Sequence, residues 1–155
     1  MKKEWDRRTV QCDYTQIQPE LRAAIEKELK ELDEELDIQF CIATESTRLK
    51  RGMFGGKQQV QHSACIVTPK WLVQAIDLGD GKTGPVAVFH YLSRMQVNSD
   101  TMELAQKLGI EDYGINVFGQ TRWNLKGSRY FIRLQQNGVT EQFINTLTEA
   151  IRKTG

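Results

Sequence analysis

The sequence predicts an α+β fold in which a seven-stranded antiparallel barrel or half-open sheet is capped by a C-terminal helix. Strand patterns follow one another along most of the chain, and many are joined by turn-sized segments. Parallel neighbours need a crossover of about a dozen residues or more, so strands joined this closely must pair antiparallel. The last strand pattern is followed by an amphipathic segment, 140–153, whose apolar residues share one helical face. Such a helix can close the open end of a curled sheet.

Length and composition predict a single domain over residues 1–155. The chain is 39% hydrophobic and 26% charged, which is typical of a globular protein. We expect a tail at 1–14, an N-terminal helix at 17–37 and a core at 38–153. The first residues are charged and the apolar stretches are strand-sized, so we expect neither a signal peptide nor a spanning helix, and a cytoplasmic location.

The first element is a tail or loosely attached strand over 1–14, and the second is a helix over about 18–37. Pro19 suits the first turn of this helix. Apolar residues recur every three or four positions and define one face: Ile17, Leu21, Ile25, Leu29, Leu32 and Leu36. We expect this face to cover the chain's own sheet. The alternatives are a homodimer seam or a partner-binding face.

The core is predicted as five strands, a short helix, two strands and the closing helix. The strand patterns lie at 38–43, 60–68, 71–77, 85–91, 94–97, 115–121 and 128–134. The inserted helix begins at Asp100, which forms a capping box with Glu103, and it ends at Gly109. The closing helix is expected to begin at Thr140 and to bury Phe143 and Leu147.

Two segments resemble bacterial members of the pleckstrin-homology-like (PH-like) superfold. They are the strand-turn-strand phrase 66–73 and the late strand 130–134, which precedes the closing helix. The resemblance covers about residues 38–153 and implies a capped antiparallel barrel that acts as a binding or scaffolding module. The extra N-terminal helix and the inserted helix depart from the family pattern, and the tryptophan that eukaryotic members carry in the closing helix is absent.

A basic loop between the first two core strands is the candidate ligand site. Residues 45–57 carry one acid and four bases, whereas residues 17–37 carry eight acids and three bases. Six side chains form the candidate: Arg48, Lys50, Arg51, Met53, Phe54 and Lys57. Its position is similar to that of the lipid-binding loop in PH-like proteins. The cations would meet anionic headgroups, each contributing about 1 kcal/mol, while the two apolar side chains enter the interface. The alternative is a solvated loop whose apolar side chains pack on the sheet.

Three other patterns predict structure and no chemistry. Gly79-x-Gly81-x-x-Gly84 has the spacing of a dinucleotide-binding turn, but the strand-like segment 85–89 follows it where a helix is needed, so we predict a hairpin loop. The three cysteines are an odd number without a C-x-x-C pair and are expected to be reduced core residues. Cys41, Cys65 and His62 could be neighbours on adjacent strands, but we expect packing and no metal or other cofactor.

The sequence contains no readable catalytic group, because no nucleophile is paired with a base. The sequence also has aromatic and basic residues of the kinds that contact nucleic acid, namely Trp71, Trp123 and Tyr130 with Arg122, Lys126 and Arg129. We attribute them to cross-strand packing and expect no nucleic-acid partner. The predicted function is therefore non-catalytic binding of a protein or peptide at the sheet edge or the first helix. The alternatives are binding of anionic membrane lipid through the basic loop and, more weakly supported, a hydrolase built from dispersed residues.

Overall fold

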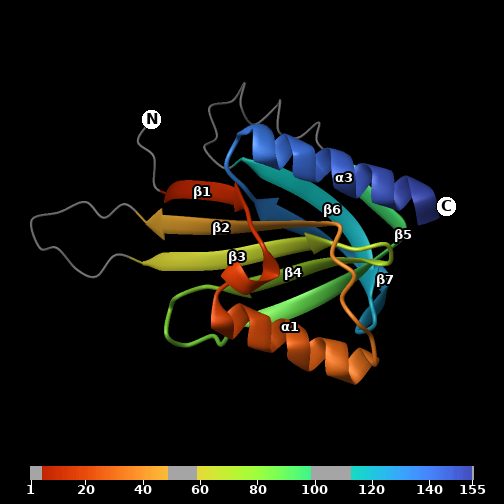
Figure 1. Ribbon diagram of the computed structural model, residues 1–155, viewed down its shortest axis with the longest axis horizontal. Coiled ribbons are helices and arrows are strands. Elements are labelled where there is room, and N and C mark those ends of the chain that lie inside the picture. The colour runs from red at the N-terminus through yellow and green to blue at the C-terminus, as the bar shows by residue number, and fades with distance from the viewer. Residues whose placement is uncertain (1–4, 49–58, 99–112, 155) are drawn as a thin grey trace, which may run out of the picture.

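The computed structural model describes residues 5–48, 59–98 and 113–154 (Figure 1). Within these ranges seven strands form one antiparallel sheet in sequential order. The strands are β1 (Trp5–Gln11), β2 (Phe40–Arg48), β3 (Val60–Val67), β4 (Trp71–Asp77), β5 (Val86–Asn98), β6 (Gly114–Thr121) and β7 (Asn124–Arg133). The helices are the 3₁₀ turn η1 (Tyr14–Gln16), α1 (Pro19–Leu32) and α3 (Gly138–Thr154).

The two long helices pack on opposite faces of the curved sheet (Figure 1). The cluster under α3 contains Phe143 and Leu147 of the helix with Ile42, Leu72 and Ile115 of the sheet, all of them fully buried. The cluster under α1 is smaller. The predicted sheet with a closing C-terminal helix is confirmed. No helix within the described ranges has both the length and the apolar composition needed to cross a bilayer.

β1 decides between the tail and the loosely attached strand predicted at 1–14, because this strand pairs with β2 along its whole length. The strand pattern is weak in the sequence, since the one buried residue of the strand is the polar Thr9. Thr9 fastens the edge strand to the segment that connects β7 and α3. Its N–H donates to Gln135 Oε1 at 3.0 Å, its hydroxyl accepts from Gln135 N–H at 2.9 Å, and its carbonyl accepts from Asn137 Nδ2 at 2.9 Å.

β5 also corrects the prediction, because the strands expected at 85–91 and 94–97 are one strand of 13 residues. Its register against β6 shifts between Tyr91 and Gln96, and Arg94 has a left-handed φ of 66°. A bulge of this kind breaks the alternation of side chains and bends the strand. Leu92 and Met95 are consequently both buried although they are three positions apart.

α1 ends at Leu32, five residues before the predicted end. Asp33 adopts a left-handed φ of 53°, and the next N–H, that of Glu34, donates to the Leu29 carbonyl. This geometry terminates the helix. Leu21 and Ile25 are buried against the strands that α1 covers, with Ile66, Val73 and Phe89 among the facing residues. The apolar face of α1 thus covers its own sheet, and these side chains are not available for a homodimer seam.

α3 begins at Gly138, slightly before the predicted start. Asn137 caps it, since its Oδ1 accepts the Thr140 N–H at 2.9 Å, whereas Thr140 itself donates its hydroxyl to the Gln135 carbonyl. Thr140, the predicted start, therefore lies within the first turn of the helix. The inserted helix predicted from Asp100 lies outside the described residues.

Candidate functional site

The predicted basic loop is represented in the structure only by its first residue. Arg48 ends β2 with an exposed side chain, and its N–H donates to the Gln59 carbonyl at 2.8 Å. The other five candidate residues lie outside the described ranges: Lys50, Arg51, Met53, Phe54 and Lys57. The site at this loop therefore stays a prediction.

The β6–β7 hairpin, residues 114–133, carries a second set of cations that we call the basic hairpin. It has four basic residues and no acidic one, the bases being Arg122, Lys126, Arg129 and Arg133. Its turn also presents large apolar side chains to solvent, since Trp123 is 77% exposed and Leu125 is 68% exposed. Exposed tryptophan beside arginine is the composition of many binding surfaces.

Cross-strand packing, which we predicted for Trp71, Trp123 and Tyr130, is found for only two of them. Trp71 packs against Phe89 and Tyr91, with ring centroids 5.7 and 4.4 Å apart. The Tyr130 ring lies against buried His90 at 4.4 Å. Trp123 is the exception, because it projects from the β6–β7 turn into solvent.

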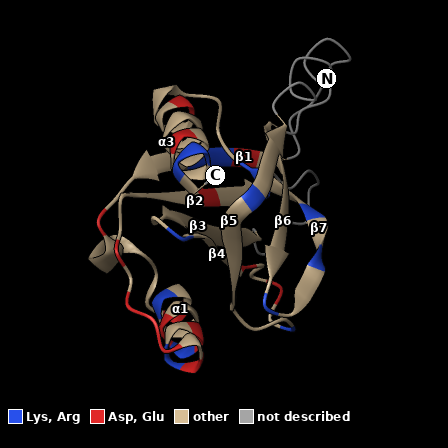
Figure 2. Cartoon of the chain, turned by 90° about the vertical axis from the view of Figure 1, so that its right-hand side faces the viewer, with Lys and Arg blue, Asp and Glu red and all other residues tan. Residues whose placement is uncertain are grey.

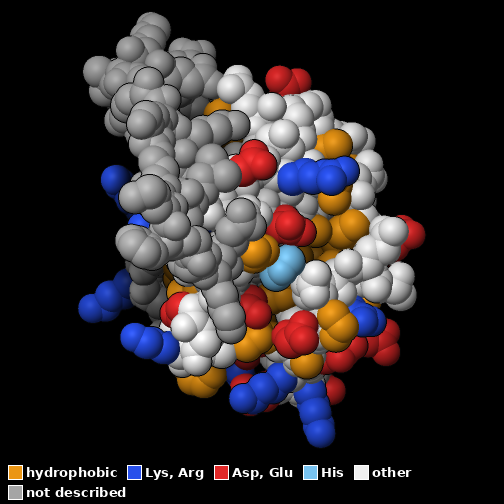
Figure 3. Space-filling view, turned by 90° about the vertical axis from the view of Figure 1, so that its left-hand side faces the viewer, with side chains coloured by type: hydrophobic (Ala, Val, Ile, Leu, Met, Phe, Trp, Pro, Cys, Tyr) orange, Lys and Arg blue, Asp and Glu red, His pale blue; other side chains and the backbone are white. Residues whose placement is uncertain are grey.

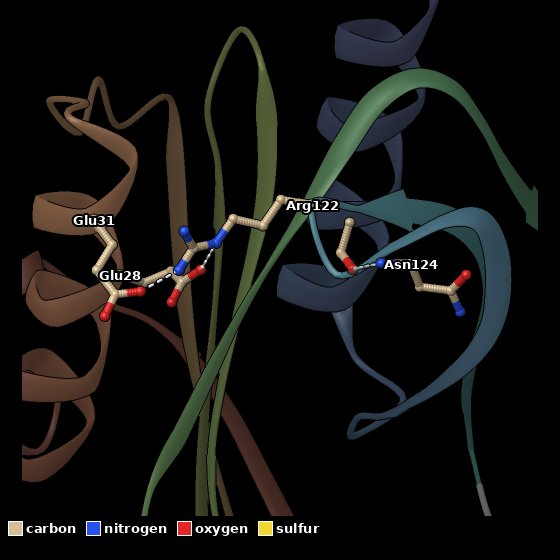
Figure 4. A network of polar contacts seen from close by, with 5 residues as sticks. Glu28, Glu31, Arg122 and Asn124 are labelled. Atoms are coloured by element: carbon tan, nitrogen blue, oxygen red, sulfur yellow. Dashed lines mark hydrogen bonds and ion pairs between the residues drawn. The ribbon is translucent and has the colours of Figure 1, made fainter.

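Arg122 holds the turn of the basic hairpin against α1 (Figure 4). Its Nε donates to Glu28 Oε1 at 2.7 Å, and its guanidinium also pairs with Glu31. The hydrogen bonds that the Arg122 guanidinium donates to Glu28 and Glu31 raise its pKa. The same guanidinium lies 4.3 Å from the centre of the Trp123 ring. The ion pairs therefore fix the backbone from which Trp123 projects, and they neutralise one of the four cations.

The outer edge of β7 presents backbone groups in a definite alternation. The Leu134 N–H donates inward to the Tyr113 carbonyl at 3.0 Å. Because backbone groups alternate along a strand, the backbone groups of Ile132 and Tyr130 also point toward β6. The backbone groups of Phe131 and Arg129 then point away from β6. β7 is the last strand of the sheet, and no strand within the described ranges pairs with this outer side. Figure 2 shows basic residues along β7 at the margin of the sheet.

The side chains of these outward residues lie on the face opposite α3. Ile132 and Leu134 are buried in the cluster under α3, so the alternating residues Arg129, Phe131 and Arg133 project to the other face. The Arg133 guanidinium lies 5.6 Å from the Phe131 ring centre, as expected for neighbours on one face. Cations and an aromatic ring thus flank the outer edge on the side away from α3.

A shallow hollow of about 170 Å³ adjoins the outer edge on the same face. It is lined by Gln96, Asn98, Asn116, Val117, Phe118 and Arg129. Pockets for small-molecule ligands measure about 300–1,000 Å³. The volume of this hollow lies below that range and suits a single side chain of a segment that lies along β7.

A larger hollow of about 260 Å³ lies between the start of α1 and the first three strands. It is lined by Arg8, Val10, Gln16, Ile17, Gln18, Leu21, Ala43, Thr44, Glu45, His62 and Ser63. Arg8, Glu45 and His62 are direct cross-strand neighbours on β1, β2 and β3. Figure 3 shows a histidine among acidic and hydrophobic side chains on this side of the molecule. Opposite charges on directly opposed residues, here Arg8 and Glu45, favour the pairing of β1 with β2.

The residues considered for a metal site are dispersed. Cys41 belongs to the cluster under α1, whereas Cys65 belongs to the cluster under α3 on the opposite face. His62 lines the hollow beside the start of α1. The second histidine, His90, is buried on β5, and burial lowers its pKa to about 4. Within the described part of the chain, no three His, Cys, Asp or Glu side chains are placed to hold a metal ion.

The glycine-rich segment 79–84 is a hairpin loop between β4 and β5, as predicted. Asp80 Oδ1 accepts the N–H groups of Lys82 and Thr83 at 2.8 Å each, and these bonds lower the pKa of its carboxyl. Gly79 has a φ of 64°, and a Cβ there would lie 2.0 Å from the Val60 carbonyl oxygen. A strand follows the loop, so no helix N-terminus is present to bind a pyrophosphate.

Known proteins provide no family or function for this chain. No family model, no curated protein and no solved structure matches this chain significantly.

Proposed function

We propose that this chain is a non-catalytic, PH-like binding module that binds an extended, acidic protein or peptide segment along the outer edge of β7. The observation that carries the proposal is the outward-facing backbone of Arg129 and Phe131 at the end of the sheet, within a hairpin that has basic residues and no acidic ones. A peptide added as a strand would obtain its hydrogen bonds from this backbone.

The side chains around the edge supply selectivity. Exposed ion pairs contribute only about 0–1 kcal/mol each, so Arg129 and Arg133 select an acidic sequence more than they hold it. Apolar contact supplies affinity, and the exposed side chains of Trp123 and Leu125 lie at the turn where β7 begins. The hollow beside Phe118 can accept one side chain of the added strand.

Cations on an edge strand have a second use, because charge discourages sheets from associating edge to edge. That role requires no exposed tryptophan. Trp123 is 77% exposed and is positioned by the Arg122 ion pairs, which favours recognition over simple protection of the edge.

A titration calorimetry experiment with two probe peptides tests the proposal. One peptide alternates glutamate with valine, and the other alternates lysine with valine at the same length. We expect binding of the acidic peptide alone. Arg129→Glu should weaken it by about fivefold, the scale of one exposed ion pair. Lys82→Glu, which makes the same charge change in the exposed β4–β5 loop, should leave binding unchanged.

A backbone variant separates strand addition from charge attraction. Phe131→Pro removes the outward N–H, and proline is tolerated at a strand edge where no ladder bond is lost. The loss of one hydrogen bond should weaken the acidic peptide by about fivefold or more, with the circular dichroism spectrum unchanged. Equal affinity of this variant and the parent protein would contradict strand addition.

Anionic vesicles are the remaining arm of the test. Sedimentation with vesicles of phosphatidylserine and phosphatidylcholine, compared with phosphatidylcholine alone, reports lipid binding. Binding to the anionic vesicles without binding to the acidic peptide would replace the proposal with the lipid alternative. Lys50→Glu and Arg51→Glu would then distinguish the predicted basic loop from the basic hairpin as the contact.

A further inference from the structure

We propose that Cys12 and Cys41 form a reversible intramolecular disulfide when the protein meets a peroxide. This site is independent of the β7 edge. The pair lies on the α1 side of the sheet, where the chain leaves β1 and enters the turn η1.

The backbone already holds the two cysteines opposite each other. The β1–β2 ladder ends with Gln11 opposite Ile42, so Cys12 is placed opposite Cys41. The Cys12 N–H donates to the Cys41 carbonyl at 3.1 Å, which continues the ladder by one bond. Directly opposed residues have Cα atoms about 4.5–5.5 Å apart, and disulfides span Cα separations of about 4.4–6.8 Å.

The sulfur atoms are also close. Cys12 Sγ lies 3.6 Å from Cys41 Sγ. A disulfide bond is about 2.05 Å long, so the two atoms need to approach by about 1.5 Å, a distance that small rotations of the two side chains supply. No break in the β1–β2 pairing is needed.

The two thiols differ in a way that assigns their roles. Cys12 is partly exposed, whereas Cys41 is buried. The hydrogen bond from Cys41 lowers the pKa of the Cys12 thiol, and the same contact together with burial raises the pKa of Cys41. Cys12 is therefore the thiol that an oxidant reaches and the one that forms a thiolate more readily.

With hydrogen peroxide the reaction proceeds in two steps. The Cys12 thiolate attacks one peroxide oxygen, the O–O bond breaks, and Cys12 becomes a sulfenic acid while hydroxide leaves and takes up a proton as water. Cys41 Sγ then attacks Cys12 Sγ, the S–S bond forms, the S–O bond breaks, and the oxygen leaves as water with the proton of the Cys41 thiol. The two sulfurs lose two electrons, which reduce one peroxide to two waters.

Cys65 provides an internal control. It pairs with Ile42 on the ladder, so its side chain lies on the opposite face of the sheet in the cluster under α3. Burial raises its pKa to about 12. We expect Cys65 to remain a thiol when Cys12 and Cys41 are oxidised.

The bridge would close the segment 12–41, which contains η1 and the whole of α1. Cross-linking a segment of this length restricts the unfolded chain. We expect the oxidised protein to melt about 5–10 °C above the reduced protein. Oxidation would also restrict the motion of Gln16 and Ile17, which lie within this segment and line the larger hollow.

The test uses the full chain treated with hydrogen peroxide and then with a maleimide. The intact mass should fall by two hydrogen atoms, and one thiol that reacts with the maleimide should remain after unfolding. Peptide mapping should show a bond between Cys12 and Cys41. A thiol reductant should restore all three thiols. Cys65→Ala should form the same bridge, leave no maleimide-reactive thiol when oxidised and regain two thiols on reduction, and Cys12→Ser should form no intramolecular disulfide.

Three results would overturn the proposal. They are three unreacted thiols, oxidation of Cys12 to a sulfinic or sulfonic acid without a bridge, and dimers on a non-reducing gel in place of the internal bond. A correctly bridged protein that melts no higher than the reduced form would contradict the bracing effect of the bridge.

Discussion

Single side chains decide how the basic hairpin is held and how the fold responds to acid. Arg122 connects the β6–β7 turn to α1 through Glu28 and Glu31, across 94 and 91 positions of sequence. His90 lies within the sheet with its Nε2 at 3.4 Å from Gln74 Oε1. Neither contact follows from local sequence, since each joins residues on different elements.

Arg122→Ala should loosen the turn from α1. Both ion pairs are lost, and surface ion pairs weaken as salt is added. We expect the melting temperature to fall by about 2 °C at low salt, with a smaller difference in 1 M sodium chloride. Lys126→Ala, at an exposed position of the same hairpin, is the matched control and should change neither value. A loss for Arg122→Ala that is the same at both salt concentrations would contradict an electrostatic origin.

His90 should make the protein sensitive to acid. Burial lowers its folded-state pKa from 6.5 to about 4, so the native protein resists protonation while the unfolded chain accepts a proton. The contribution of neutral His90 to the free energy of unfolding is fully present above about pH 6.5. It is lost progressively as the pH falls toward 4, by up to about 3 kcal/mol.

Urea unfolding of His90→Phe and His62→Gln across this pH range measures the effect. We expect His90→Phe to lose most of the acid sensitivity and the half-buried His62→Gln to keep it. Equal pH dependence in both variants would assign the sensitivity to other groups.

At the scale of elements, the β6–β7 hairpin depends on a glycine under an aromatic ring. Gly127 has a φ of 91°, and a Cβ at this position would lie 2.8 Å from the Phe118 ring. Gly127→Ala combines an unfavourable backbone conformation with a steric clash, and we expect a loss of about 1–3 kcal/mol in the free energy of unfolding. Gly84→Ala is the matched control because a Cβ there meets open space. Chemical denaturation that shows equal stability for the two variants would refute this explanation.

The elements also show which features a sequence pattern can predict. The faces of α1 and α3 were predicted correctly, because the spacing of Leu21 and Ile25, or of Phe143 and Leu147, directly reflects which side is buried. β1 was predicted only as the alternative to a tail, because its buried residue is a polar threonine whose hydroxyl contacts Thr44 and Gln135. The bulge in β5 was missed because it replaces alternation with a spacing of three, which divides one strand into two apparent ones.

The candidate site was predictable only in part. The absence of acidic residues from the β6–β7 hairpin is visible in the sequence and could have indicated a binding surface. Its position at the margin of the sheet was not visible, because the number and order of the strands depend on β1 being paired. The exposure of Trp123 likewise follows from the ion pairs of Arg122 with a helix distant in sequence.

On the scale of the whole molecule, the described helices and strands leave the outer side of β7 without a pairing strand. α3 covers one face and α1 covers β4 and β5 on the other. At the first edge, the side chains of Gln135 and Asn137 occupy backbone groups of Thr9 in β1. β7 forms the other edge, where the backbone N–H and C=O groups of Arg129 and Phe131 point away from the sheet. This arrangement supports the proposal that the strand edge of β7 is the binding surface.

Amide hydrogen exchange followed residue by residue by NMR, with and without the acidic peptide, tests this claim most directly. Before the peptide is added, the amides of Tyr130 and Ile132 should exchange slowly and those of Arg129 and Phe131 quickly. Binding should slow exchange at Arg129 and Phe131 and leave the inward amides nearly unchanged. Protection that appears elsewhere, or a bound peptide that slows neither outward amide, would contradict recognition at the edge of β7.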